Sequence, residues 1–113
     1  MNKISYKDNH SDTFDTALAF LECRAREAGL KDFSLDKAFT YNETQQNELD
    51  DGFVSETVLF DHVSGKRTFG VEVYKDEVTS VWVSDESGDF VDEGTDVSNI
   101  RNDPKSWFDK VLP

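Results

Sequence analysis

Two alternating apolar segments joined by only two residues constrain the fold of this chain more than any other feature. The segments are residues 67–74 and 77–84, and Lys75 and Asp76 connect them. Apolar residues at every second position are typical of β-strands with one buried face. Because the connection is so short, the two strands must pair as an antiparallel hairpin. One face is predicted to carry Phe69, Val71, Val73, Thr79, Val81 and Val83, and the other Thr68, Glu72, Tyr74, Val78, Ser80 and Trp82.

A third strand before this hairpin makes the sheet a meander. Residues 53–63 are rich in Val and Phe, and Ser64-Gly65 provides the turn into the next strand. Residues 85–102 are acidic and rich in turn formers, with one further short strand predicted at Phe90-Val91. The sequence thus predicts an antiparallel sheet of three to five strands over residues 53–91.

The remaining segments before the sheet give weaker patterns. Residues 1–10 are interpreted as a polar arm or an edge strand. Residues 30–41 fit either a strand or a short helical turn, because their apolar residues allow both. Residues 42–52 are almost entirely polar and are interpreted as a solvated loop.

Helices are predicted at both ends of the sheet. Residues 12–28 have an apolar stripe at helical spacing and end at Gly29, a common helix stop. Residues 103–112 begin with Asp103, a good N-cap, and Pro104 at the first helical position. The stripes are Phe14, Ala17, Leu18, Leu21, Ala25 and Ala28 in the first helix, and Trp107, Phe108, Val111 and Leu112 in the second.

Together these elements predict one α+β domain over residues 1–113. Its long N-terminal amphipathic helix packs on the antiparallel meander, and its short C-terminal helix packs on the sheet or on the long helix. Fourteen aromatic residues supply enough apolar surface for a core in a chain of 113 residues.

The negative charge is concentrated in the predicted sheet region. Residues 42–102 contain fifteen acidic and four basic residues, a net charge of -11 out of -12 for the chain. Such a field attracts basic surfaces and repels nucleic acid and anionic membranes. Eight acids fall between Lys75 and Arg101 with no basic residue among them: Asp76, Glu77, Asp85, Glu86, Asp89, Asp92, Glu93 and Asp96.

No residue pattern predicts a metal site. Asp85, Ser87, Asp89, Glu93 and Asp96 follow the ligand spacing of a calcium loop. The sixth position of that loop requires Gly for its sharp turn, but here it is Phe90. With one Cys and two His far apart in sequence, zinc ligands are also lacking. We expect no metal and no cofactor.

Catalytic patterns are equally lacking. Cys23 lies inside the predicted long helix, a setting typical of a packing residue, and neither His10 nor His62 is near it in sequence. The six glycines form no phosphate-binding loop. We therefore expect a protein that is not an enzyme.

The sequence favours a cytoplasmic location. A single cysteine excludes an internal disulfide and fits a reducing compartment. The N-terminal residues have no signal-peptide pattern, and no segment approaches the about 20 apolar residues that a membrane span requires.

Protein recognition is the function that these features favour. The leading hypothesis is an acidic inhibitor that occludes the site of a basic nuclease or other nucleic-acid-binding protein by mimicking nucleic acid. Toxin-immunity proteins and phage counter-defence proteins act in this way, and the sequence does not choose between them. The alternative is a non-enzymatic α+β adaptor or small-ligand-binding module, whose acidity serves solubility and whose pocket lies between the long helix and the sheet.

The predicted contact set combines carboxylates with two aromatic anchors. An exposed Trp or Tyr beside charged residues is typical of an interface anchor. Burial under a helix is slightly favoured for Trp82, and exposure for Tyr74. The set is Glu72, Tyr74, Asp76, Glu77, Trp82, Asp85, Glu86, Asp89, Asp92, Glu93 and Asp96.

Overall fold

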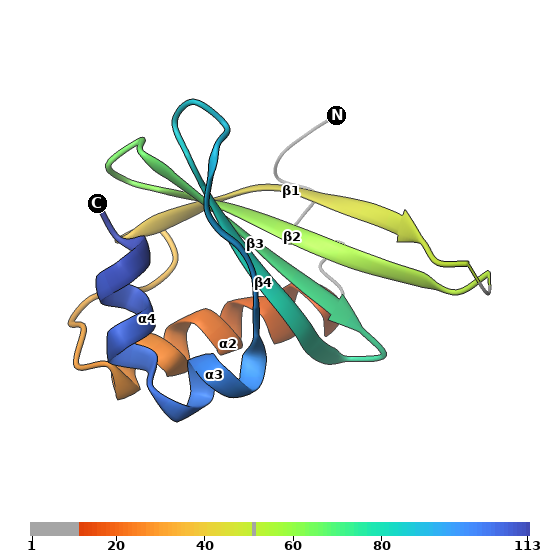
Figure 1. Ribbon diagram of the computed structural model, residues 1–113, viewed down its shortest axis with the longest axis horizontal. Coiled ribbons are helices and arrows are strands. Elements are labelled where there is room, and N and C mark those ends of the chain that lie inside the picture. The colour runs from red at the N-terminus through yellow and green to blue at the C-terminus, as the bar shows by residue number, and fades with distance from the viewer. Residues whose placement is uncertain (1–11, 51) are drawn as a thin grey trace.

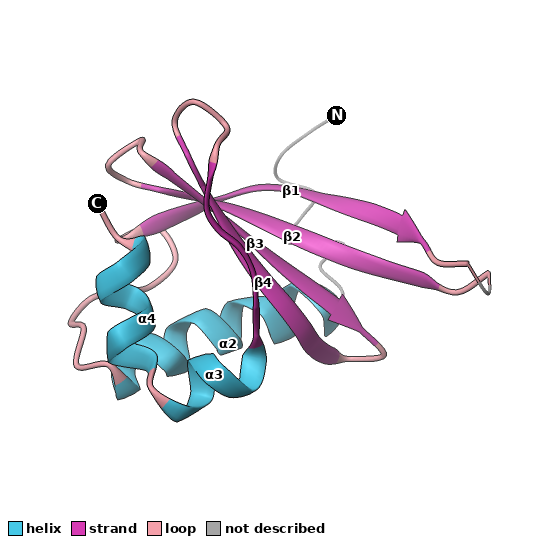
Figure 2. Ribbon diagram, in the orientation of Figure 1, coloured by secondary structure: helices cyan, strands magenta, loops and turns pink. Residues whose placement is uncertain are grey.

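The computed structural model describes residues 12–50 and 52–113, so the predicted arm at residues 1–10 lies outside the described residues. Figures 1 and 2 show two layers, one of helices and one of strands. The elements in chain order are α2 (Asp12–Glu27), β1 (Phe39–Glu48), β2 (Val54–His62), β3 (Arg67–Tyr74), β4 (Glu77–Asp85), β5 (Phe90–Asp96), α3 (Val97–Asn102) and α4 (Pro104–Val111).

The five strands form one antiparallel sheet in the order β1-β2-β3-β4-β5. The prediction of an α+β fold with a long N-terminal helix, an antiparallel meander and a short C-terminal helix is confirmed. Helices α2, α3 and α4 all lie on one side of the sheet (Figure 1), and no described helix covers the opposite side. The two faces of the sheet therefore have different environments.

The core lies between the helices and the sheet, as the apolar patterns predict. Helix α2 buries Phe14, Ala17, Phe20, Leu21 and Ala25, which follow its predicted stripe apart from Phe20. Helix α4 begins at Pro104 with Asp103 as its N-cap, as predicted. Aromatic rings join the layers: the Phe39 and Phe60 rings are 5.2 Å apart in an edge-to-face arrangement, and the Phe33 and Phe108 rings are also 5.2 Å apart. Burying rings of this size is the main source of stability in a domain of this length.

The prediction of a solvated loop at residues 42–52 is wrong, because β1 continues to Glu48. The strand pairs with β2 along its whole length, with Gln45 opposite Thr57 and Asn47 opposite Ser55. It is an edge strand, and residues 42–46 are all exposed to solvent. Because neither face of this half of the strand is buried in the core, its side chains show no apolar alternation.

A β-bulge changes the predicted faces of the central hairpin. Glu72 pairs with Ser80 but Val73 pairs with Val78, so Thr79 is left unpaired in the ladder. Val78 is consequently buried in the core while Thr79 is exposed, the reverse of the prediction. An extra residue in one strand interrupts the alternation, so the side chains before and after it no longer follow one regular pattern.

The acidic segment after this hairpin is more regular than predicted. Strand β5 extends from Phe90 to Asp96, beyond the two residues predicted, so the sheet covers residues 39–96 rather than 53–91. Asp96 then caps helix α3 by accepting a hydrogen bond from the Ser98 amide at 2.8 Å. This helix was not predicted from the sequence.

Candidate functional site

The side of the sheet that faces away from the helices is the main candidate surface, and we call it the open face. Its side chains form rows across the strands, as the pairing register requires. The first row is Asp61, Thr68, Ser84 and Phe90; the second is Glu43, Leu59, Gly70 and Trp82; the third is Gln45, Thr57, Glu72 and Ser80. The open face thus combines three carboxylates with small polar residues and two aromatic rings.

Trp82 lies over Gly70 in the middle of the open face. A Cβ atom on Gly70 would lie 2.1 Å from Cε2 of Trp82, so only glycine leaves room for the indole at this height. The Phe90 ring packs edge-on against the indole, with centroids 5.7 Å apart, and Phe90 is 55% exposed. The predicted burial of Trp82 under a helix is therefore wrong: the ring is half-buried, and the sheet itself supports it.

Glu72 is fixed at the centre of the face by neutral donors. Its carboxylate accepts hydrogen bonds from the hydroxyls of Ser55 at 3.1 Å, Ser80 at 2.9 Å and Thr79 at 3.2 Å. Hydroxyl donors orient a carboxylate without neutralising its charge. No described cation lies within 4.0 Å of Glu72.

Asp61 is held in a similar way in the neighbouring row. It accepts hydrogen bonds from the Thr68 hydroxyl at 2.8 Å and from the Asn42 amide at 3.1 Å. Among the residues that the structure describes, no cation lies within 4.0 Å of Asp61 or Glu43 either. The open face therefore presents fixed negative charges that no described cation neutralises.

A second aromatic group lies at the other end of the face. The Tyr74 and Phe53 rings pack edge to face with centroids 6.2 Å apart, and the Lys75 ammonium lies 5.3 Å and 5.0 Å from their respective centroids. Phe53 is 48% exposed, whereas Tyr74 is half-buried rather than exposed as expected. Phe53 was not predicted as a site residue, because its position next to Tyr74 depends on the register of the sheet.

The structure separates the predicted acidic residues instead of gathering them. Asp85, Glu86 and Asp89 lie in or beside the β4–β5 turn, next to Phe90 and the open face. Asp85 fixes this turn by accepting hydrogen bonds from the amides of Ser87 at 2.9 Å and Asp89 at 3.0 Å. The members outside this region are Asp76 and Glu77 at the β3–β4 turn, Asp92 and Glu93 on β5, and Asp96 at the start of α3.

Asp92 lies in the core, where no partner can reach it. Its carboxylate accepts a hydrogen bond from the buried Trp107 Nε1 at 2.7 Å, and further ones from the Thr95 hydroxyl and the Gly94 amide. Partial burial acts to raise the pKa of Asp92, but the three hydrogen bonds, together with the charge of Lys110, outweigh it and the pKa is lowered. The residue thus joins β5 to α4, a structural role.

The described residues show no constellation for catalysis or metal binding. Within residues 12–50 and 52–113, no three His, Cys, Asp or Glu side chains are grouped so as to hold a metal ion. Cys23 accepts a hydrogen bond from Arg26 at 3.1 Å, whereas His62 bonds to the Ser64 hydroxyl at 2.8 Å. Burial and the charge of Arg67 lower the pKa of His62. Its ring therefore stays neutral at pH 7, and it stabilises a turn.

Comparison with protein-family models, curated proteins and solved structures finds no match to this chain. No helix among the described residues is long and apolar enough to cross a membrane.

Proposed function

We propose that this chain is an acidic inhibitor that docks through its open face and β4–β5 turn on a basic nuclease or other nucleic-acid-binding protein. It occludes the partner's nucleic-acid site, as toxin-immunity and phage counter-defence proteins do, and it has no enzymatic activity of its own. One observation carries the proposal: Glu43, Asp61 and Glu72 have no described cation beside them, and they share the open face with the half-buried Trp82. The single Cys23 is consistent with action in the reducing cytoplasm.

The dimensions of the molecule suit this mechanism. The molecule measures 36 Å along its longest axis. Duplex DNA presents one charge per about 1.7 Å of helix axis. A cleft that binds DNA is therefore complementary to closely spaced anions over such a length. Complementary charge also accelerates encounter and makes association sensitive to salt.

The aromatic rings supply the part of the interface that charge cannot. A flat, half-buried indole can stack on an arginine of the partner while Glu72 and Asp61 pair with basic residues next to that arginine. Interfaces of this kind concentrate their binding energy in a few aromatic and arginine residues. Trp82 and Phe90 are therefore the proposed anchors, and Glu72, Asp61, Glu86 and Asp89 the charged surround.

The test is a pull-down from nuclease-treated lysate of the host or its competitors, washed first at low salt and then at about 0.5 M, where the screening length is well under 10 Å. The variant E86K/D89K reverses two charges beside the open face. The control D12K/D109K makes the same change in net charge on the helix side. We expect one basic nucleic-acid-binding protein to be retained by the parent and the control and lost by E86K/D89K.

Two outcomes would contradict the docking proposal. One is a partner that both charge variants retain equally. The other is a partner whose retention is unaffected by Trp82→Ala, because the proposed anchor would then contribute nothing.

A second candidate is a small-ligand-binding module without enzymatic activity. It is favoured by a cavity of about 440 Å³ between α2, α3 and the β3–β4 turn, on the helix side of the sheet. This volume lies within the range of small-molecule sites. In this case the acidity of the chain serves solubility, and binding would persist in high salt.

A further inference from the structure

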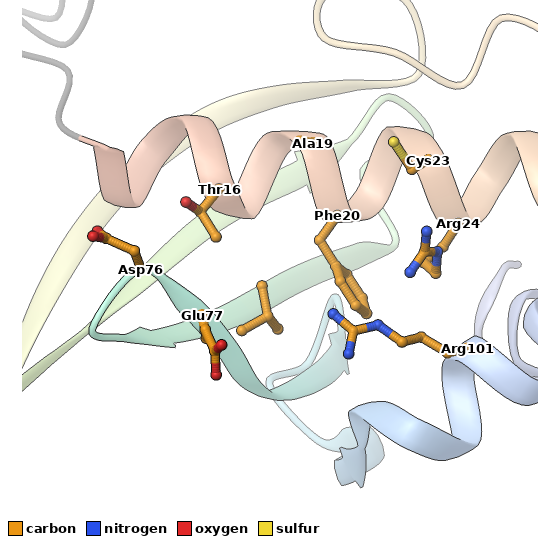
Figure 3. A pocket seen from close by; sticks show the side chains of 9 residues that line it. Thr16, Ala19, Phe20, Cys23, Arg24, Asp76, Glu77 and Arg101 are labelled. Atoms are coloured by element: carbon orange, nitrogen blue, oxygen red, sulfur yellow. The ribbon is translucent and has the colours of Figure 1, made fainter.

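The cavity beside α2 has opposite charges at its two ends. Figure 3 shows the side chains of Asp76 and Glu77 at one end and those of Arg24 and Arg101 at the other. Phe20 and Val78 lie among the lining residues and provide an apolar wall. Because the cavity lies on the helix side, a ligand bound there rests on the second candidate function and does not depend on docking at the open face.

The cationic end brings two arginines from different helices to one ring. The guanidinium carbons of Arg24 in α2 and Arg101 in α3 lie 5.4 Å and 5.6 Å from the centroid of Phe20. Arg24 is paired with Glu27, with Nη2 donating at 3.1 Å and a less well-directed Nε contact at 3.0 Å. Arg101 has no described carboxylate within 4.0 Å. This end therefore keeps one positive charge that no described carboxylate neutralises, in a chain whose acids outnumber its bases 24 to 12.

The anionic end likewise has no cation beside it among the described residues. Lys75 is the nearest base in sequence to Asp76 and Glu77, but its ammonium lies over Phe53 and Tyr74. Asp76 and Glu77 are exposed and form no ion pair with any residue that the structure describes. Two separate unneutralised charges of opposite sign at one cavity are the complement of a zwitterion.

The length of the cavity determines how far apart the two charged groups of a zwitterionic ligand must be. Its α2 wall runs from Thr16 to Arg24, and eight residues of helix rise about 12 Å. The charged groups of a free α-amino acid are too close together to reach both ends. Three residues of extended chain span about 10 Å, which matches the cavity.

We propose that this cavity binds a short extended peptide of about three residues with free termini. The peptide carboxylate lies at Arg101, whose planar guanidinium can donate two parallel hydrogen bonds to it. Its ammonium group lies between Asp76 and Glu77. An apolar central side chain packs on Phe20 and Val78.

The experiment is a titration of the ¹⁵N-labelled full chain with the tripeptide Ala-Leu-Ala, followed by amide chemical shifts. We expect the shifts to move at residues lining the cavity, with saturation at millimolar peptide. Peptides acetylated at the N-terminus or amidated at the C-terminus should each bind at least about ten-fold more weakly, because each lacks one charged hydrogen-bonding group.

Two variants test which end of the cavity binds which terminus of the peptide, and a third is a control. Arg101→Gln should weaken the binding of Ala-Leu-Ala at least about ten-fold. The weak binding of the C-terminally amidated peptide should stay unchanged. Glu77→Gln should weaken the binding of the peptide with free termini and leave the binding of the N-acetylated peptide unchanged. Lys110→Gln removes an exposed lysine from α4, outside the cavity, and should have no effect.

The proposal is overturned if the tripeptide moves no cavity amide at about 10 mM, or if the amidated peptide binds as well as the free acid. It is also overturned if Lys110→Gln weakens binding as much as Arg101→Gln. Because Arg101 and Glu77 are exposed, both variants should keep the parent spectrum, which shows that the fold is intact. The open-face variant E86K/D89K should bind the tripeptide normally, so failure of peptide binding and failure of docking are separate results.

Discussion

Among single residues, Asp92 shows how an acidic side chain can be part of the core. Asp92→Ala should lower the free energy of unfolding by about 2–3 kcal/mol, because it leaves the buried Trp107 Nε1–H without an acceptor. The measurement is urea unfolding followed by circular dichroism. The neighbouring exposed Glu93→Ala is the control and should change stability by less than about 0.5 kcal/mol. Equal effects of the two variants would show that Asp92 is not structural.

The lowered pKa of Asp92 also predicts a pH dependence of stability. Its pKa lies below the ordinary value of 3.8, so the unfolded chain binds more protons than the folded one around that pH. The stabilisation is therefore present above pH 3.8 and is lost as pH falls through the folded pKa. Asp92→Asn should flatten the decline of the urea midpoint below about pH 4. The lowered pKa of His62 also makes stability fall as the pH falls, but between about pH 7 and 5. Asp92→Asn should leave this part of the decline unchanged.

Gly70 is the residue that sets the height of Trp82 above the sheet. Gly70→Ala would place a Cβ against the indole, so the ring must move away from the strand. We expect a loss of about 1–3 kcal/mol in unfolding free energy. The chain has two tryptophans, and only the indole N–H resonance of Trp82 should shift, while that of Trp107 should not. Ser84→Ala, on the same face, is the control; an unmoved Trp82 signal in Gly70→Ala would contradict this geometry.

At the scale of elements, the β3–β4 turn is correctly placed but built from unfavourable residues. Lys75 and Asp76 both have positive φ, 51° and 64°, as a two-residue hairpin turn requires. Asn and Gly adopt this conformation at less cost. The double variant K75N/D76G should raise the free energy of unfolding by about 1 kcal/mol or more. Gly65→Ala, at φ 75° in another turn, should lower it; a loss of stability in both variants would contradict this account of the turn.

Elements with a buried face could be predicted from the sequence, and elements without one could not. Helix α2 and strand β3 each bury a regular row of apolar side chains, so their patterns are visible in the sequence. The outer half of β1 buries nothing in the core and is held by backbone pairing with β2, which side-chain patterns do not report. The burial of Asp92 and the exposure of Phe53 likewise depend on the register between strands and on contacts with residues distant in sequence.

The open face could likewise be predicted from the sequence only in part. The alternation predicted that Glu72 and Trp82 share a face, and they do. It could not predict that Gly70 lies beneath the indole or that a bulge at Thr79 buries Val78. Charge counting located the acidic region but not its division among the β4–β5 turn, the β3–β4 turn and the core.

At the scale of the whole molecule, the net charge of -12 should make the chain more stable in salt. The ion pairs among the described residues involve Arg24, Lys37 and Lys105, and none of them neutralises a carboxylate of the sheet. Repulsion among these carboxylates opposes the compact state, and salt screens it. The melting temperature should therefore rise by several degrees between about 10 mM and 0.5 M NaCl, where the screening length falls from about 30 Å to under 10 Å.

The same screening should act in opposite directions on stability and on docking. Calorimetry of E86K/D89K, whose net charge is -8 instead of -12, should show a smaller rise in melting temperature with salt than the parent. Partner retention by the parent should fall over the same salt range, because long-range attraction is screened there too. A melting temperature that stays constant or falls with salt would mean that the carboxylates of the sheet do not repel one another appreciably. Docking through the open face would then lack its electrostatic driving force, whereas peptide binding in the cavity would be unaffected.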